Sequence, residues 1–405
     1  MLQHLALRNF RNFEHLDIAF PDAGIAIVGE NGHGKTNLLE AVSYLALFRS
    51  IRGAKDSDAV LFGAPAFHVR AGLALPARFS TVSVGYERAT KRKRATLDGV
   101  DQERLSLAFG ALPSVCFSPA DVALVAGGPA ERRHFLDVAL ALSVAGYLPA
   151  LQQYRSALRQ RSAALRVAQR GGGRVTAAHE ASVAVWEPSL SRAGGVLASS
   201  RRTWCATHAA EFSVMCAAIG ERAGVKLRYA GTDGRSPHEG VTSAADSERA
   251  DAAIAAAGDV AGREGDAPTP QASEVARAYQ SAFDEQRGNE LRRGITLVGP
   301  HRDDMSLTLG ARDLRTFGSA GQQRTAAIAL RMLELSSLRK AIGATPLLLL
   351  DDPFAELDTN RSARILSLLE ERGVGQVLLA VPREEDIPRT FTRLERRAMV
   401  NGALR

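Results

Sequence analysis

Eight consecutive residues have the types and spacing needed to hold a phosphate. They are Gly29, Glu30, Asn31, Gly32, His33, Gly34, Lys35 and Thr36. They fit the P-loop pattern of Gly, four residues, Gly, Lys and Thr, in which the glycines let the backbone wrap closely around an anion. Lys35 would reach the β- and γ-phosphates of ATP, and Thr36 would hold Mg²⁺. The motif predicts an ATP site, which we extend to Asn37; a glycine-rich turn with a chance lysine is the structural alternative.

The elements on either side of this motif are those that a phosphate-binding loop requires. Residues 25–28 form a short apolar run that predicts a buried strand. After the motif, apolar residues recur at helical spacing up to about Phe48. A helix that begins at the loop would direct its free N–H groups at the bound phosphate. The motif is therefore predicted to lie at a strand-to-helix turn.

A second apolar run, at residues 346–350, ends in two carboxylates, Asp351 and Asp352. This is the Walker B pattern, in which a buried strand delivers a carboxylate beside the P-loop. Asp351 would hold the hydration shell of Mg²⁺, and Asp352 would polarise an attacking water. An apolar run followed by two aspartates also suits any buried strand, and only the P-loop in the same chain favours the catalytic interpretation.

Two further segments near this strand fit the same kind of nucleotide machine. The first is Ser319, Ala320, Gly321, Gln322, Gln323 and Arg324, which precede a predicted helix. Small and polar residues at a helix N-terminus can bind an anion, as in an ABC-type signature motif, or can simply cap the helix. The second is Glu356, Leu357 and Asp358. Asp358 would cap the next helix, lie in a D-loop at a dimer interface, or do both.

Composition excludes several classes of protein. The chain has 405 residues, enough for two or three domains, and carries a formal net charge of +7. That charge favours a polyanionic partner, although a modest arginine excess also occurs in proteins that bind no nucleic acid. Three cysteines without a Cys-x-x-Cys pair indicate neither a disulfide framework nor a zinc site. No signal peptide or membrane-length apolar run is present, so a cytoplasmic location is expected.

The remaining residues predict an ordered succession of elements. Alternating apolar residues indicate a hairpin near residues 5–20 and an antiparallel sheet over 67–100. Near one hairpin tip of that sheet, four cations either contact DNA phosphates or blunt an edge strand: Lys91, Arg92, Lys93 and Arg94. Residues 131–219 are mostly helical, with a break at 171–173. Residues 230–270 contain almost no large apolar side chain and predict a loop or disordered insertion, and a helix follows over 273–292.

Residues 299–304 concentrate charge where a turn enters a predicted strand. They are Gly299, Pro300, His301, Arg302, Asp303 and Asp304. A turn is the simple interpretation. A metal site formed by His301 with Asp303 and Asp304 is the alternative that these residue types allow.

Taken together, these segments resemble the RecF family of bacterial recombination-repair ATPases along nearly the whole chain. The resemblance rests on the P-loop and Walker B residues, on the signature-like segment 319–324, on 299–304, and on 356–358. It also rests on residues 7–13, on Phe117-Ser118-Pro119 with Asp121, and on Glu131-Arg132-Arg133 with residues 135–137. Transporter-type ABC ATPases usually lack the helical insert, and SMC-type ATPases carry long coiled coils, which the sequence does not show.

The resemblance implies an α/β fold, namely an ABC-type P-loop ATPase head with a mixed sheet, an antiparallel β-subdomain and an inserted helical arm. It implies a head formed by residues 1–128 and 291–405, with the arm at 129–290. The resemblance implies a protein that dimerises when it binds ATP and that binds double-stranded DNA near single-strand gaps. It also implies that the protein works with RecO and RecR and helps to load recombinase. Roles in DNA replication, DNA damage repair and the SOS response, and a place near the nucleoid, are implied in the same way.

The resemblance also assigns residues by position. Arg11 and Asn12 would lie near the nucleotide, and the signature residues would reach the partner subunit's γ-phosphate. There are two departures from the expected patterns: Ala380 and Val381 stand where relatives usually place Thr or His, and Asp352 stands where most ABC-type sites have a glutamate. Apolar side chains cannot hydrogen-bond to the nucleotide. Slow, DNA-stimulated hydrolysis is therefore expected; the alternatives are a nucleotide-gated DNA clamp with little hydrolysis, or another SMC- or ABC-type ATPase.

Overall fold

A computed structural model describes residues 1–74, 78–170, 175–231, 269–355, 357–373, 375–387 and 389–405. The predicted break at 171–173 and most of the predicted insertion at 230–270 lie outside these residues. At the centre is a mixed sheet whose neighbouring strands, in order, are β15 (Ala403–Leu404), β14 (Glu395–Val400), β3 (Gly24–Val28), β13 (Val377–Val381), β12 (Leu347–Asp351) and β8 (Ser114–Phe117). From β14 to β8 the strands are parallel.

This parallel arrangement explains why the chain's two apolar runs meet. β3 and β12 both pair with β13, so their carboxyl ends lie at one edge of the sheet. In open α/β sheets that edge is where ligands bind. β12 is buried on both faces: Leu347 and Leu349 pack into one hydrophobic cluster, and Leu348 and Leu350 into another.

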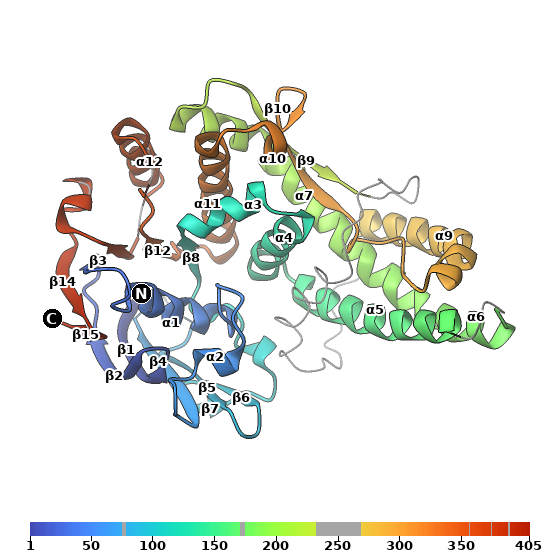
Figure 1. The fold of residues 1–405 in the computed structure, drawn as a ribbon, viewed down its shortest axis with the longest axis horizontal. Coiled ribbons are helices and arrows are strands. Elements are labelled where there is room, and N and C mark those ends of the chain that lie inside the picture. The colour runs from blue at the N-terminus through green and yellow to red at the C-terminus, as the bar shows by residue number, and fades with distance from the viewer. Residues whose placement is uncertain (75–77, 171–174, 232–268, 356, 374, 388) are drawn as a thin grey trace.

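An antiparallel sheet covers one side of the core, as the alternating pattern predicts. Its strands, in order, are β2 (Phe13–Ala19), β1 (Leu2–Phe10), β4 (Ala66–Leu73), β5 (Thr81–Glu87), β6 (Arg92–Leu97) and β7 (Val100–Asp101). Helix α1 (Lys35–Leu47) packs between this sheet and the central one, in a cluster that joins Leu5, Val69, Val84, Leu38 and Leu349. Figure 1 shows both sheets beside α1. Asp98 and Gly99 both have positive φ, so the predicted hairpin turn is confirmed.

Helices form the arm, which extends away from the two sheets in Figure 1. They are α4 (Pro129–Ser143), α5 (Tyr147–Arg170), α6 (Ala177–Ala184), α7 (Glu187–Ile219) and α9 (Pro270–Arg293), preceded by the short α3 (Ala123–Ala126). α7 packs against both α5 and α9. The arm is therefore a compact helical bundle rather than a coiled coil. No helix in the described part of the chain is long and apolar enough to cross a membrane.

A small sheet joins the arm to the C-terminal part of the chain. β10 (Asp304–Leu309) pairs with β11 (Arg312–Asp313) on one side and with β9 (Val225–Ala230) on the other. This sheet therefore pairs a strand that precedes the predicted boundary at 290/291 with strands that follow it. Next come α10 (Leu314–Phe317) and α11 (Ala320–Ile342), which packs against α4 and α7. α12 (Thr359–Glu371) follows β12.

Residues 299–304 enter β10 as the predicted turn, and their side chains bind residues of α4, α5 and β9. Arg132 of α4 donates two hydrogen bonds to Asp304, each 2.8 Å long. Tyr229 donates to Asp303, and the Tyr154 hydroxyl lies 2.6 Å from His301 Nδ1. No cluster of three metal-ligating side chains occurs among the described residues, and these three have separate partners. The metal alternative for His301, Asp303 and Asp304 is not supported; their side chains instead contact residues of the arm and of the strand that contains Tyr229.

Two half-buried histidines are expected to make the junction of head and arm sensitive to acid. Burial, together with the charges of nearby arginines, lowers the pKa of His134 and of His301 to about 3. The Nε2 atom of His134 lies 2.8 Å from an Arg49 guanidinium nitrogen and so accepts its hydrogen bond, which requires a neutral ring.

Unfolding gives each histidine its ordinary pKa near 6.5, so the unfolded chain binds more protons below that pH. Stability from these groups is complete above pH 6.5 and falls as the pH drops toward 3. At pH 5 we expect a loss of about 2 kcal/mol per histidine. Urea unfolding at pH 7 and pH 5 measures it, with His134→Gln as the comparison. An equal pH dependence in wild type and in His134→Gln would show that His134 carries no part of it.

Candidate nucleotide site

The P-loop lies at the turn between β3 and α1. Gly32 and Gly34 have φ of 87° and 107°, which only glycine adopts without strain. The Lys35 ammonium folds back onto the loop and donates to the carbonyls of Gly29, at 2.5 Å, and Glu30, at 2.9 Å. Burial lowers the pKa of Lys35, and the charges of Asp351 and Asp352 oppose that shift. Lys35 is thus a poorly hydrated cation held at the mouth of an anion-binding loop.

Asn12 supports the loop from behind. Its amide oxygen accepts from the Asn37 side chain at 2.8 Å, and its amide nitrogen lies 3.4 Å from the His33 carbonyl. A Cβ added to Gly34 would meet the Asn12 amide at 2.6 Å, so Asn12 packs directly against the loop. The Gly402 amide donates to the same His33 carbonyl at 3.0 Å. The structure therefore places Asn12 beside the P-loop, where a supporting role fits its contacts.

Arg11, the neighbour of Asn12, has a different position. Its guanidinium forms hydrogen bonds of 2.9 and 2.6 Å with Glu40, whose side chain is fully buried in α1, and one of 2.8 Å with the Asp58 carbonyl. All three of its nitrogens are engaged. The contact with ATP expected for Arg11 finds no support in this geometry, because the side chain anchors α1 from the side.

Thr36 and Asp351 meet although 315 residues separate them in sequence. The Thr36 hydroxyl donates to the Asp351 carboxylate at 2.9 Å. Burial raises the pKa of Asp351, the Thr36 hydrogen bond opposes this, and the charge of Asp352 raises it further. Two carboxylates held together are stabilised by a cation, and hydroxyl and carboxylate oxygens are the ligands that Mg²⁺ prefers. These residues therefore fit a Mg²⁺ ion that arrives with a nucleotide.

Asp352 has an unusual backbone. Its φ is 45°, in the left-handed region, and its amide donates to the Ala380 carbonyl at 2.8 Å. Left-handed residues other than glycine tend to occur at functional sites, where the surrounding structure stabilises them. Ala380 and Val381 are buried at the end of β13. Their side chains present no polar atom to the site, as the sequence comparison with the family pattern indicated.

Arg52 is a site residue that the sequence did not identify. It follows α1 in a turn, and its guanidinium donates to the Asn37 side chain at 3.2 Å. Its charge lowers the pKa of Asp351, against the effect of burial. More than half of this side chain is exposed, so the cation lies at the open edge of the P-loop. No local pattern marks it, because its position depends on how the chain turns after α1.

The predicted signature segment begins helix α11. The Ser319 hydroxyl accepts from the Gln322 amide at 3.3 Å, and the Gln322 side chain accepts from the Ser319 amide at 2.9 Å. This capping box leaves the hydroxyl proton of Ser319 free to donate. The Gln323 side chain donates to the carbonyls of Leu314 and Arg315. Within one chain the segment is thus a capped helix N-terminus, and hydrogen bonds from the side chains of Gln322 and Gln323 stabilise it.

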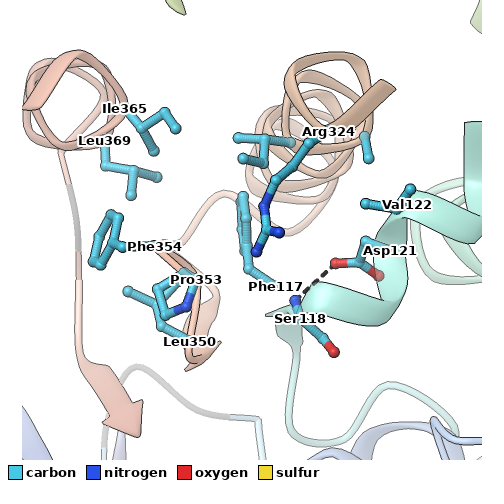
Figure 2. A pocket seen from close by; sticks show the side chains of 12 residues that line it. Phe117, Ser118, Asp121, Val122, Arg324, Leu350, Pro353, Phe354, Ile365 and Leu369 are labelled. Carbon is cyan, nitrogen blue, oxygen red and sulfur yellow. Dashed lines mark hydrogen bonds between the residues drawn. The ribbon is translucent and has the colours of Figure 1, made fainter. Parts of the chain in front are cut away.

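Arg324 differs from the other signature residues. It is buried, and Figure 2 shows its side chain entering a pocket between α11 and the residues that follow β8 and β12. Apart from Arg324, Ser118 and Asp121, this pocket is lined by apolar side chains: Phe117, Val122, Ala327, Ile328, Leu350, Pro353, Phe354, Ile365 and Leu369. The prediction that Arg324 acts on the partner subunit's nucleotide is therefore not supported. The side chain joins α11 to the core of its own chain.

Asp358 caps helix α12. Its carboxylate accepts from the Arg361 amide at 2.9 Å and lies 3.5 Å from the Arg361 guanidinium. A Cβ added to Gly321 would meet that guanidinium at 2.5 Å, so α12 contacts the signature segment. Capping is confirmed for Asp358. Of the D-loop, Glu356 lies outside the described residues.

The four cations predicted to contact DNA divide between two faces of β6. Lys93 points inward: its ammonium lies 2.6 Å from Asp56, donates to the Phe48 carbonyl, and faces the Tyr44 ring. Burial lowers its pKa, and Asp56 opposes the shift. Arg92 and Arg94 point to the exposed face, and Lys91 is exposed in the turn. Lys93 is thus a structural cation, because alternation along a strand sends every second residue inward.

Comparison with known proteins places this arrangement in a family. Residues 1–398 match the model of the RecF/RecN/SMC N-terminal domain. The DNA replication and repair protein RecF of Pseudarthrobacter chlorophenolicus is 34% identical over 399 residues, covering 96% of this chain and 94% of that protein. RecF of an Exiguobacterium species is 33% identical over 373 residues, covering 91% and 89%.

Solved structures show the same fold. A structure of the recombination mediator protein RecF with ATP in the RecFOR pathway is 25% identical, with a TM-score of 0.79 and coverage of 100% of this chain and 96% of that one. The Smc head domain of Pyrococcus furiosus, bound to the C-terminal domain of ScpA, is 15% identical with a TM-score of 0.50 and covers 100% and 95%. The predicted ABC-type head is confirmed.

Proposed function

Because this chain belongs to the RecF family, we propose that it acts in DNA replication and repair as an ATP-gated, DNA-binding protein that dimerises around two nucleotides. One observation carries the ATP site: the 2.9 Å hydrogen bond between Thr36 and Asp351, which joins the P-loop to the Walker B strand. Gly29 to Asn37 would bind the phosphates, with Lys35 on the β- and γ-phosphates. Bound Mg²⁺ would neutralise the developing charge.

Support for a dimer comes from the signature segment. Ser319 keeps a donor available at the N-terminus of α11, a helix of 23 residues whose dipole favours negative charge there. The pocket of Figure 2 separates α11 from β12 within one chain. We infer that Ser319 and the amide of Gly321 contact the γ-phosphate of an ATP bound by a partner subunit. Each ATP would then contact both subunits and stabilise the dimer.

Hydrolysis is proposed to be slow. Asp352 lies beside Asp351, where its carboxylate can polarise a water. The buried Ala380 and Val381 offer no side-chain hydrogen bond to the γ-phosphate. These two positions also support the second candidate, a nucleotide-gated clamp with little hydrolysis. RecO and RecR are proposed as partners because a relative's structure is described as part of the RecFOR pathway. Double-stranded DNA near gaps is proposed because relatives are named DNA replication and repair proteins.

Molecular mass and ATPase rate, measured together with and without double-stranded DNA, test this proposal. We expect Mg-ATP to double the mass and DNA to raise a slow rate. Ser319→Arg is the matched variant: it should bind ATP normally yet remain monomeric, because the larger cation blocks the partner's nucleotide. A mass that ATP leaves unchanged in wild type would contradict the dimer. ATP-driven dimerisation and DNA binding without any turnover would favour the clamp.

A further inference from the structure

The outer face of the antiparallel sheet carries a row of basic residues. Cross-strand pairing across β2, β1, β4, β5 and β6 places five residues side by side: His15, Arg8, His68, Gly85 and Arg94. Residues paired across strands point to the same face, and the opposite face packs on α1. Arg70 lies on the same face, two residues beyond His68 on β4. We call these six residues, His15, Arg8, His68, Gly85, Arg94 and Arg70, the basic row; none of the six is acidic.

The arginines of the basic row are not neutralised. Arg8, Arg70 and Arg94 are exposed, and none of them forms an ion pair with another of the described residues. Burial lowers the pKa of His68, and the charges of Arg70 and Arg8 lower it further. Like charges gathered without counter-ions cost free energy unless an anion covers them. This differs from Lys93 on the inner face, which has Asp56 as its partner.

Three acids of the outer face lie beside the row, namely Asp17, Glu87 and Asp101, which pairs with Thr96 at the sheet edge; the first two already have partners. Asp17 binds His4 on the neighbouring strand, and Glu87 accepts a hydrogen bond from Thr90 in the turn. Between these two acids the face offers small side chains, including Gly85. Because Gly85 has no side chain, nothing projects from the sheet between His68 and Arg94. A rod-shaped polyanion could therefore contact both residues.

We propose that the outer face of this sheet is the surface that binds double-stranded DNA, through Arg8, Arg70 and Arg94 on the phosphate backbone. Three strand spacings separate Arg8 from Arg94, or about 14 Å. Phosphates on one DNA strand rise by roughly 3.4 Å each along the helix axis, so the row spans about four of them. Such contacts read charge and not base sequence. This inference rests on the proposed function, because it assigns a face to the DNA binding proposed there.

A triple variant tests the basic row. Arg8→Gln, Arg70→Gln and Arg94→Gln together should weaken binding of a fluorescent double-stranded DNA roughly 10- to 100-fold at 0.15 M salt, with Mg-ATP present. The slope of log affinity against log salt should shrink by about 2 to 3, since each phosphate contact contributes about 0.9. ATP binding and ATP-driven dimerisation should be unchanged, because none of these residues contacts the P-loop.

A single substitution provides an independent readout. Gly85→Asp places an anion in the centre of the row. A Cβ at Gly85 would lie 3.5 Å from His68 and from the Phe67 carbonyl, which is ordinary contact, so the sheet should fold. We expect it to weaken DNA binding while Gly85→Ala does not. If Gly85→Asp binds DNA as wild type does, the proposed face is wrong.

The control makes the same change of charge on the arm. Arg159, Arg166 and Arg170 of α5 are exposed, and their triple replacement by Gln should leave DNA affinity within a fewfold of wild type. Equal losses in the arm and sheet variants would contradict the assignment of this face, as would wild-type affinity in the sheet variant. Failure of wild type itself to bind DNA with ATP would instead overturn the proposed function, so the two failures are distinguishable.

Discussion

Lys35→Met is expected to abolish ATP binding and, with it, ATP-driven dimerisation and hydrolysis. The Lys35 ammonium donates to two loop carbonyls and is poorly hydrated where it lies. A nucleotide would replace these carbonyls with phosphate oxygens, and each charge-assisted hydrogen bond contributes about 1.5–3 kcal/mol. Methionine has similar length and no donor. Affinity for ATP, measured by titration calorimetry, should fall about 100-fold or more.

Lys340→Met, at the exposed end of α11, makes the same chemical change away from the site. It should bind ATP as wild type does. Thermal unfolding of both variants shows whether either substitution damages the fold. ATP affinity in Lys35→Met within threefold of wild type would mean that this loop does not hold the phosphates as proposed.

Asp352→Asn is expected to separate hydrolysis from binding. Asparagine adopts the left-handed backbone conformation of this residue at least as readily as aspartate, so the turn after β12 should survive. The amide cannot take a proton from water, and loss of a general base costs roughly 100-fold or more in rate. The variant should still bind ATP and form the ATP-dependent dimer. Its complex with DNA should form as in wild type and last as long or longer.

Asp351→Asn is the matched comparison, because it removes a carboxylate one residue away that is held by Thr36. This variant should hydrolyse ATP more slowly, and its affinity for ATP should depend less on Mg²⁺. Single-turnover hydrolysis and ATP affinity, measured for both variants, distinguish the two roles. Normal hydrolysis by Asp352→Asn would show that another group activates the water.

The local motifs allowed most of the fold and the nucleotide site to be predicted. A P-loop between an apolar run and a helical repeat specifies its own strand–turn–helix, because both periodicity and glycine geometry act over a few residues. The hairpin at Asp98 and Gly99 and the caps at Ser319 and Asp358 are similarly local. The strands of the antiparallel sheet followed from alternation, which needs no knowledge of the partner strand.

The direction of individual charged side chains was harder to predict. Lys93 was grouped with its exposed neighbours. A strand, however, directs every second side chain inward, and Lys93 forms an ion pair with Asp56 on the inner face. Arg11 was assigned to the nucleotide by the family resemblance and Arg324 by the signature motif. In the structure Arg11 anchors α1, and Arg324 enters the pocket below α11. The long side chain of an arginine can point toward a ligand or toward the protein core. The position of the nearest carboxylate or cavity determines its direction, and this position depends on the tertiary structure.

The sequence by itself determined the family, the ATP-site motifs and the order of strands and helices, because each depends on residues near one another in the chain. Tertiary structure alone decided the rest. It brought Thr36 to Asp351 and Arg52 to the P-loop, paired β9 with β10 across the predicted boundary, and aligned Arg8 with Arg94 on one face. These contacts join residues far apart in sequence, and only the register and packing of separate elements fix which side chains meet.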